Sequence, residues 1–160
     1  SSTGFKADIY TTGRDDFDDP HELAKFAATV NLSLEDFRKK FEYLIGYEPP
    51  PLVIDVDGEA VGGIGFEIGQ DVHRRSAEIG YWLGRAVWGR GIATEAVRAV
   101  TAWAFSQHDL CRVEAHVFGW NAASMRVLEK VGYACEARHR RAVTKDGATV
   151  DMVIFAMLQP

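Results

Sequence analysis

Apolar residues recur at the spacing of an α-helix in four stretches of the chain. The pattern predicts helices from about His21 and over 33–46, 92–107 and 121–132. In the last of these helices, Asn121 has the residue type of an N-cap and Gly132 that of a C-terminal cap. The face of the third helix that we expect to be buried comprises Ile92, Ala93, Ala96, Val97, Val100, Trp103 and Ala104.

Strand-like segments occupy much of the remaining chain. Alternating or continuous apolar residues predict strands over 5–13, 51–56, 59–68, 76–84 and 111–118, and two more within 135–158. Asp57-Gly58 and Asp146-Gly147 favour type I′ turns, so each is expected to join two strands into a hairpin. The order of helices, three strands, helix, strand, helix and two strands predicts a mixed α/β (α+β) fold with one sheet and helices on its faces.

Length and charge narrow the classes of function. The chain has 160 residues, which fits a single domain over 1–160, and its formal net charge is −5. The negative charge argues against a nucleic-acid binder that depends on phosphate contacts, and the basic run at 138–141 is interpreted as a solvated face. No apolar run approaches the roughly 20 residues that span a bilayer, and no signal-peptide pattern is present. We therefore expect a cytoplasmic protein without nucleic-acid or membrane partners.

The cysteine pattern predicts no metal site. Cys111 and Cys135 lack the spacing of metal ligands, and two cysteines are too few for a disulfide framework in a chain of this length. We expect both to be reduced, buried thiols.

The stretch "VWGRGIATEA", residues 87–96, places two glycines directly before a predicted helix. A helix N-terminus has about four N–H groups without internal partners, and glycines leave them open to an anion such as a phosphate. The alternative is an ordinary turn in which glycine supplies a positive φ. Neither the P-loop nor the Rossmann fingerprint fits, because no lysine follows a suitable glycine and the third Rossmann glycine is replaced by Thr94.

A longer pattern does fit. The run "AEIGYWLGRAVWGRGIATEAVRAVTAWAF" followed by "RVEAHVFGWNAASMRVLEKVGY" resembles the GNAT superfamily of acetyl-CoA-dependent N-acetyltransferases, and within it the Rim-type branch that acetylates ribosomal proteins. The superfamily's Gln/Arg-x-x-Gly-x-Gly/Ala loop maps onto 88–93, with Trp88 in place of Gln or Arg. The resemblance is strongest over 77–133. It implies a mostly antiparallel mixed sheet of about six or seven strands, in which a splayed strand pair forms the acetyl-CoA cleft.

The same resemblance implies how acetyl-CoA is bound. Backbone N–H groups of the loop hold the pyrophosphate, and the strand around Trp82 and Leu83 pairs with the pantetheine arm, whose amides need backbone-type partners. A backbone N–H near Leu83 polarises the thioester carbonyl. Asn121 bonds to the pantetheine arm, or serves only as a helix N-cap. The implied cofactor-binding residues are Trp82, Leu83, Gly89, Arg90, Gly91, Ile92, Ala93, Thr94 and Asn121.

For catalysis, the resemblance implies that Ser124 protonates the departing thiolate. The alternative is that Ser124 is merely tolerated in the first turn of its helix. Glu78 is the first choice for the general base, against the alternative of a solvated or cross-strand-paired carboxylate. Some Rim-type relatives use a glutamate where this chain has Val143. The further candidate bases are Glu114, His116, Glu136 and Asp151.

The acceptor implied by the branch is the α-amine of a protein or peptide. An α-amine with a pKa of about 7.7–8.0 is roughly one-third neutral near pH 7.5, whereas a lysine amine with a pKa of about 10.4 is almost wholly charged. Two alternatives stay open: a small amine such as a polyamine, amino acid or aminoglycoside, and a module that binds acetyl-CoA without catalysis. A homodimer is one candidate for the oligomeric state.

Overall fold

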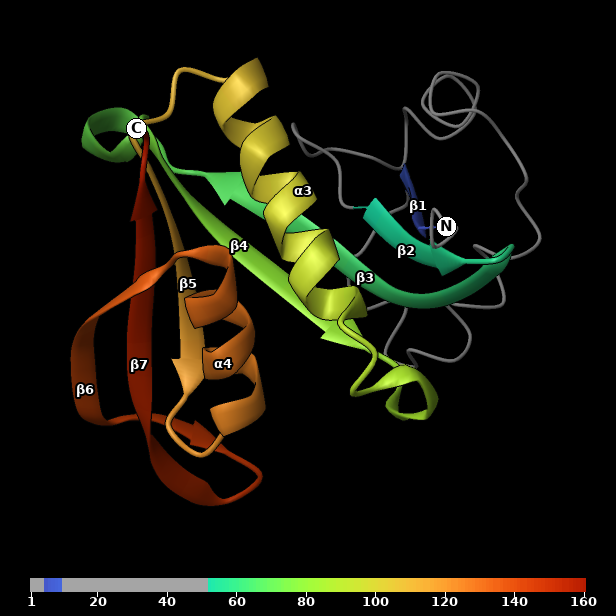
Figure 1. The fold of residues 1–160 in the computed structure, drawn as a ribbon. Helices are drawn as coiled ribbons and strands as arrows, with labels where there is room; N and C mark the ends of the chain where they lie inside the picture. Colours follow the sequence, from blue (N-terminus) through green and yellow to red (C-terminus); the bar gives the residue numbers. More distant parts are fainter. Residues whose placement is uncertain (1–4, 10–51) are drawn as a thin grey trace, which may run out of the picture. The chain divides into compact units, whose positions relative to one another are not determined.

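The computed structural model describes residues 5–9 and 52–160, so the two helices expected before residue 47 lie outside the described residues. The helices and strands are β1 (Phe5–Ile9), β2 (Leu52–Val56), β3 (Glu59–Ile68), β4 (Ser76–Leu83), α3 (Ile92–Gln107), β5 (Arg112–Phe118), α4 (Ala122–Val131), β6 (Ala134–Lys145) and β7 (Ala148–Leu158), with short 3₁₀ turns η2 (Asp71–His73) and η3 (Arg85–Val87) (Figure 1).

Both predicted hairpins form with the predicted turn chemistry. Asp57 and Gly58 have φ values of 54° and 85°, and Asp146 and Gly147 have 52° and 76°. Positive φ at both central residues is the signature of a type I′ turn. Gly58 also donates its N–H to the Asp55 carboxylate at 2.9 Å. The local sequence therefore sets the pairing next to each turn, although both hairpins change register further along.

The strands form a mixed sheet with the order β1-β2-β3-β4-β5-β7-β6. Pairs β1–β2, β2–β3, β5–β7 and β6–β7 are antiparallel, whereas β4–β5 is parallel. The predicted mixed α/β fold class is thus confirmed. The chain divides into two compact units, one made of residues up to Phe66 and Tyr81–Ala96, the other of Glu67–Gly80 and Val97–Pro160.

In the first unit, β3 approaches the end of β4 closely. Gly84 donates its N–H to the Val61 carbonyl at 2.7 Å, and a Cβ on Gly62 would collide with the Trp82 carbonyl oxygen. Gly62 is therefore required by the close backbone approach. Since consecutive residues of a strand direct their backbone groups to opposite edges, the N–H and C=O of Leu83 face away from β3.

In the second unit, pairing between β4 and β5 is short. It runs from Ser76 opposite Arg112 to Glu78 opposite Glu114 and then stops, although both strands continue. Beyond this point β5 stays paired with β7 as far as Phe118 opposite Met152. The expected splaying of one strand pair stays a prediction.

Burial follows the predicted pattern on α3, with one polar addition. Ile92, Ala96, Val97, Val100 and Ala104 are buried, while Ala93 and Trp103 are partly exposed. Thr101 is also buried, and its hydroxyl lies 2.7 Å from the Tyr133 hydroxyl after α4. This hydrogen bond satisfies two polar groups inside the second unit.

The predicted burial of the two thiols is wrong. Cys111 and Cys135 are free but exposed. Cys135 lies on β6, at the end of the strand order, and Cys111 directly precedes β5 with its thiol donating to the Arg75 carbonyl at 3.3 Å. Residues at a sheet edge and in a connecting loop are covered on fewer sides than core residues, which accounts for the exposure.

Candidate functional site

The entrance to α3 lies in the first unit and contains backbone N–H groups without helical partners. Gly89 and Gly91 both have a φ of +75°, a conformation that favours glycine. The first backbone hydrogen bond into the helix runs from the Glu95 N–H to the Gly91 carbonyl at 3.1 Å. The N–H groups of Ile92, Ala93 and Thr94 precede this bond, so they have no helical carbonyl to donate to.

The space outside these N–H groups is open at both glycines. A Cβ built on Gly89 or Gly91 meets nothing within 4 Å. The turn uses the positive φ of these glycines, which confirms the turn interpretation, and their missing side chains leave room for the anion that the other interpretation predicts. With the positive end of the helix dipole at the same point, this entrance suits an anion.

Trp88 connects the loop to the end of β4. Its indole N–H donates to the Leu83 carbonyl at 2.8 Å, and the Arg85 guanidinium lies 5.5 Å from the centre of its ring. The hydrogen bond and the cation–π contact fix the stretch between strand and loop. The Leu83 carbonyl faces away from β3, so the Trp88 side chain contacts the edge of β4 that is not paired with β3. Hydrophobic periodicity does not predict this hydrogen bond between residues five positions apart.

The predicted acid and bases lie in the second unit. At the start of α4, the Asn121 side chain accepts a hydrogen bond from the Ser124 N–H at 3.2 Å, which confirms the predicted N-cap. Gly132 adopts a φ of 112° at the other end of the helix, as expected for its cap. Ser124 is partly exposed. Its role as an acid and the contact of Asn121 with pantetheine stay predictions.

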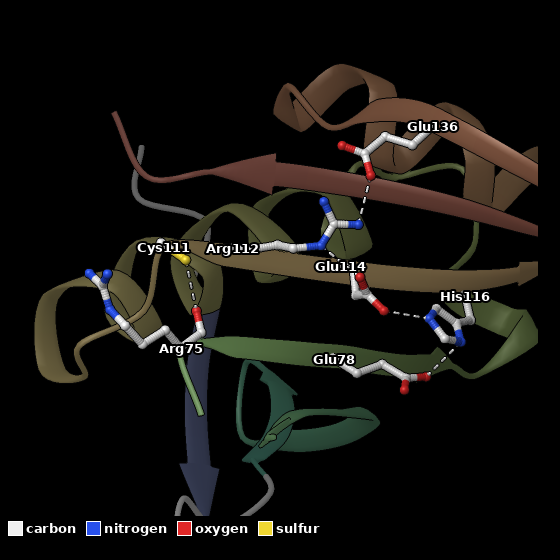
Figure 2. Close-up of polar contacts among 7 residues, drawn as sticks. All are labelled: Arg75, Glu78, Cys111, Arg112, Glu114, His116 and Glu136. Carbon is white, nitrogen blue, oxygen red and sulfur yellow. Dashed lines mark hydrogen bonds and ion pairs between the residues drawn. The ribbon is translucent and has the colours of Figure 1, made fainter. Parts of the chain in front are cut away.

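Four of the five candidate bases join in one array, which we call the charge ladder: Glu78, His116, Glu114, Arg112 and Glu136 (Figure 2). His116 Nδ1 lies 3.5 Å from Glu78 Oε1, and His116 Nε2 lies 2.8 Å from Glu114 Oε1. Arg112 then joins two carboxylates, with Nε 2.7 Å from Glu114 and a terminal nitrogen 2.7 Å from Glu136. Basic and acidic side chains thus alternate along the array.

Arg112 is the member that the sequence did not suggest. Arg112, Glu114 and His116 alternate along β5, so they lie on one face of the sheet. Glu136 reaches Arg112 from β6 although β7 lies between β5 and β6. Its position explains this contact, because Cys135 pairs with Phe155 and Ala137 with Ile154, which leaves Glu136 as the extra residue of a β-bulge.

The ladder fixes the charge of its inner members. Burial raises the pKa of Glu114, but the hydrogen bonds from His116 and Arg112 outweigh it and hold this pKa below its usual value. The hydrogen bond from Arg112 likewise lowers the pKa of Glu136, and the same contact leads the causes that raise the pKa of Arg112. Both carboxylates are therefore ionised at neutral pH, and each already forms an ion pair with Arg112.

Asp151 has a different setting from the other four candidates. It accepts the backbone N–H of Arg141 at 2.9 Å and the Arg138 side chain at 3.0 Å. These two bonds, the backbone one first, lower its pKa. Arg141 has a φ of 52° within a register shift between β6 and β7, so Asp151 stabilises an irregular turn of the strand. Val143 lies just beyond it, opposite Val150.

Among residues 5–9 and 52–160, no group of three or more histidine, cysteine or acidic side chains could hold a metal ion. None of the helices within these ranges is long and apolar enough to cross a membrane.

Comparison with known proteins places this arrangement in a family. The model of the acetyltransferase (GNAT) domain matches residues 10–134. The chain belongs to the GNAT acetyltransferase family. The Rim-type resemblance is also supported, since the relatives of this GNAT domain include one that is named as a ribosomal N-acetyltransferase and a solved structure named RimJ. The family match and several relatives with N-acetyltransferase names mark the chain as an N-acetyltransferase domain.

Two relatives come from Bacillus subtilis and carry provisional names. YjcK, an N-acetyltransferase by name, is 45% identical over 54% of this chain and 48% of its own length. YdaF, a ribosomal N-acetyltransferase by name, is 32% identical over 79% of this chain and 67% of its own length. Among solved structures, Mycobacterium smegmatis RimJ in complex with CoA-disulfide is 36% identical, with a TM-score of 0.63 over 68% of this chain and 52% of that chain. The matched part thus spans about half of YjcK and of RimJ.

Proposed function

We propose that this protein transfers the acetyl group of acetyl-CoA to the N-terminal α-amine of a protein or peptide. The observation that carries the proposal is the accessible entrance to α3, where glycines with positive φ stand before three N–H groups without helical partners. Hydrogen-bond donors at a helix N-terminus suit the diphosphate of coenzyme A. The likeness to YdaF and RimJ supports a protein or peptide as the acceptor.

In this proposal the loop 89–94 holds the diphosphate through its N–H groups, with Arg90 as a cation at the rim. The N–H of Leu83 faces the edge of β4 away from β3, where it supplies a donor for the thioester carbonyl. Trp82 takes part through its strand position rather than its carbonyl, because that carbonyl lies against Gly62. Asn121 meets the pantetheine arm. Ser124 protonates the departing thiolate, and the proton that the nitrogen loses as the amide forms restores the serine hydroxyl.

Glu78 is the base in this proposal. Glu114 and Glu136 are both bonded to Arg112, and Asp151 is bonded to two partners of its own. The Glu78 side chain is 56% exposed, against 27% for Glu114, and its described ion pair is the long one to His116. An accessible carboxylate with a weak partner can take a proton from an incoming ammonium, directly or through water.

The experiment is an acceptor panel with acetyl-CoA. One peptide has a free α-amine and no lysine, its matched control is N-terminally blocked and contains one lysine, and the third group holds a polyamine, an amino acid and an aminoglycoside. Mass spectrometry reports the gain of one acetyl group and its site. We expect acetylation of the free α-amine alone.

Two results contradict this acceptor. Transfer to small amines with none to peptides replaces the proposed acceptor by a small molecule. Binding of acetyl-CoA with no transfer to any member of a broad panel indicates a non-catalytic module.

A further inference from the structure

The two sides of the His116 ring face unequal carboxylates (Figure 2). On the Nε2 side, Glu114 is 2.8 Å away and is itself bonded to Arg112 at 2.7 Å. On the Nδ1 side, Glu78 is 3.5 Å away and more than half exposed. The first contact has the length of a strong hydrogen bond, while the second is too long for one. His116 is therefore fixed on one side and adjustable on the other.

Glu114 determines which ring nitrogen keeps its proton. A carboxylate that Arg112 holds ionised is a permanent acceptor, so Nε2 of His116 stays protonated and donates to it. The lone pair that can gain or lose a proton is then the one on Nδ1, and this nitrogen faces Glu78. Nδ1 is consequently the ring nitrogen that is available to Glu78.

The other groups around His116 leave this arrangement undisturbed. From β4 the neighbours on this face are Ser76, Glu78 and Gly80, and from β5 they are Arg112 and Glu114. β7 contributes apolar residues opposite β5, with Ile154 directly across from His116. From β6, Glu136 acts through Arg112, and His139 lies opposite Met152, one step further along the face. Among the described residues, Glu78 is the titratable group that faces Nδ1.

We propose that His116 is a positioning residue and proton relay for Glu78, an inference that rests on the proposed function. The acceptor ammonium passes its proton to the Glu78 carboxylate, which leaves a neutral amine for attack on the thioester. Glu78 then hands that proton to Nδ1 of His116 and becomes a carboxylate again. The imidazolium, whose side chain is 32% exposed, releases the proton to water and returns to its starting form.

The direct transfer needs only a small movement. Closing the 3.5 Å separation to a hydrogen-bond length requires a shift of about 0.6 Å, which the exposed Glu78 side chain can make, or one bridging water. Glu114 and Arg112 keep the ring in place during this shift. The ladder thus combines a rigid inner half with an adjustable outer half.

The test compares His116→Gln with the wild type. Glutamine keeps an amide donor for Glu114 but cannot relay a proton. We expect kcat to fall about tenfold at neutral pH with KM for acetyl-CoA unchanged, and the low-pH limb of the kcat profile to change shape, because only the need for an ionised Glu78 then remains. His139→Gln, a matched change on β6, should leave both the rate and the profile as they are.

A second readout does not need turnover. In ¹⁵N NMR of the imidazole, the neutral ring should carry its proton on Nε2 in the wild type, and Glu114→Gln should weaken that preference. A preference for Nδ1–H in the wild type overturns the relay.

The kinetic outcomes separate the two proposals. An active wild type together with a His116→Gln profile of unchanged shape overturns the relay and leaves the acetyltransferase proposal standing. A wild type that acetylates no amine overturns the proposed function and the relay with it.

Discussion

The entrance to α3 is built from backbone groups, whereas the charge ladder is built from side chains. At the entrance, the binding groups are backbone N–H groups, and the glycines matter because they have no side chain that would cover those groups. In the ladder, five side chains from three strands hold one another in place. The first arrangement suits binding of an anion, and the second suits the control of a proton. Substitutions in the two regions should therefore separate affinity for coenzyme A from turnover.

The largest expected effect is on affinity, from Gly91→Glu. The new carboxylate occupies the space where the diphosphate is expected, so coenzyme A binding should weaken more than about 100-fold by isothermal titration calorimetry. Gly147→Glu is the matched control, because Gly147 has nearly the same φ, 76° against 75°, and equally open surroundings. Both variants should lose similar stability, about 1–2 kcal/mol for a left-handed residue. Equal affinity of the two folded variants for coenzyme A would contradict the assignment of the loop to the diphosphate.

A smaller effect, on turnover alone, is expected from Ser124→Ala. If Ser124 protonates the thiolate, kcat should fall about tenfold while affinity for coenzyme A is retained. The N-cap survives this change, because Asn121 bonds to the backbone N–H of residue 124. Ser106→Ala on α3 controls for the loss of a hydroxyl elsewhere. An unchanged rate in steady-state assays takes Ser124 out of the acid role.

Trp88→Phe tests the link between β4 and the loop. Removing the indole N–H breaks the bond to Leu83, worth about 1 kcal/mol, and should weaken coenzyme A binding about fivefold with little change in kcat. Trp88→Gln, which restores a side-chain donor, should recover part of the affinity. The control is Trp120→Phe at another exposed tryptophan. A loss of kcat with unaltered affinity would contradict a role confined to the loop.

The smallest effect concerns stability rather than function. The pKa of Asp151 is lowered in the folded protein, so its contribution is present above the ordinary value of 3.8 and is lost as the pH falls through the folded pKa. Asp151→Asn should therefore lower Tm at pH 7, and the difference from the wild type should shrink in the acid range. Glu67→Gln, at an exposed strand position, provides the comparison. If the difference in Tm between Asp151→Asn and the wild type does not change with pH, the ionised Asp151 carboxylate does not contribute this stability.

The predictability of each region follows the same division. The helix entrance, both caps of α4 and both type I′ turns were predictable, because each depends on residues within a few positions of one another. The mixed sheet followed from the order of the elements. The assignment of this loop to the diphosphate rests on the spacing of its glycines and on the family resemblance, and it stays a prediction.

The contacts of the ladder depend on information that is not local. Glu114 and His116 were predictable as neighbours on one face, but Glu136 reaches Arg112 only because of a bulge on a strand beyond β7. The turn-stabilising role of Asp151 arises from the positive φ of Arg141 ten residues earlier in the chain. The exposure of the thiols depends on which strand lies at the edge of the sheet. Register and strand order decide these features, and hydrophobic periodicity does not encode them.

The most direct test of the central claim is a ¹H–¹⁵N correlation spectrum of the labelled protein titrated with coenzyme A. If the entrance to α3 holds the diphosphate, the amide signals of Ile92, Ala93 and Thr94 should move downfield as they gain a charged acceptor, and a fragment with the diphosphate should reproduce the shifts that pantetheine alone does not. Coenzyme A binding that leaves these three amides unmoved would contradict the account.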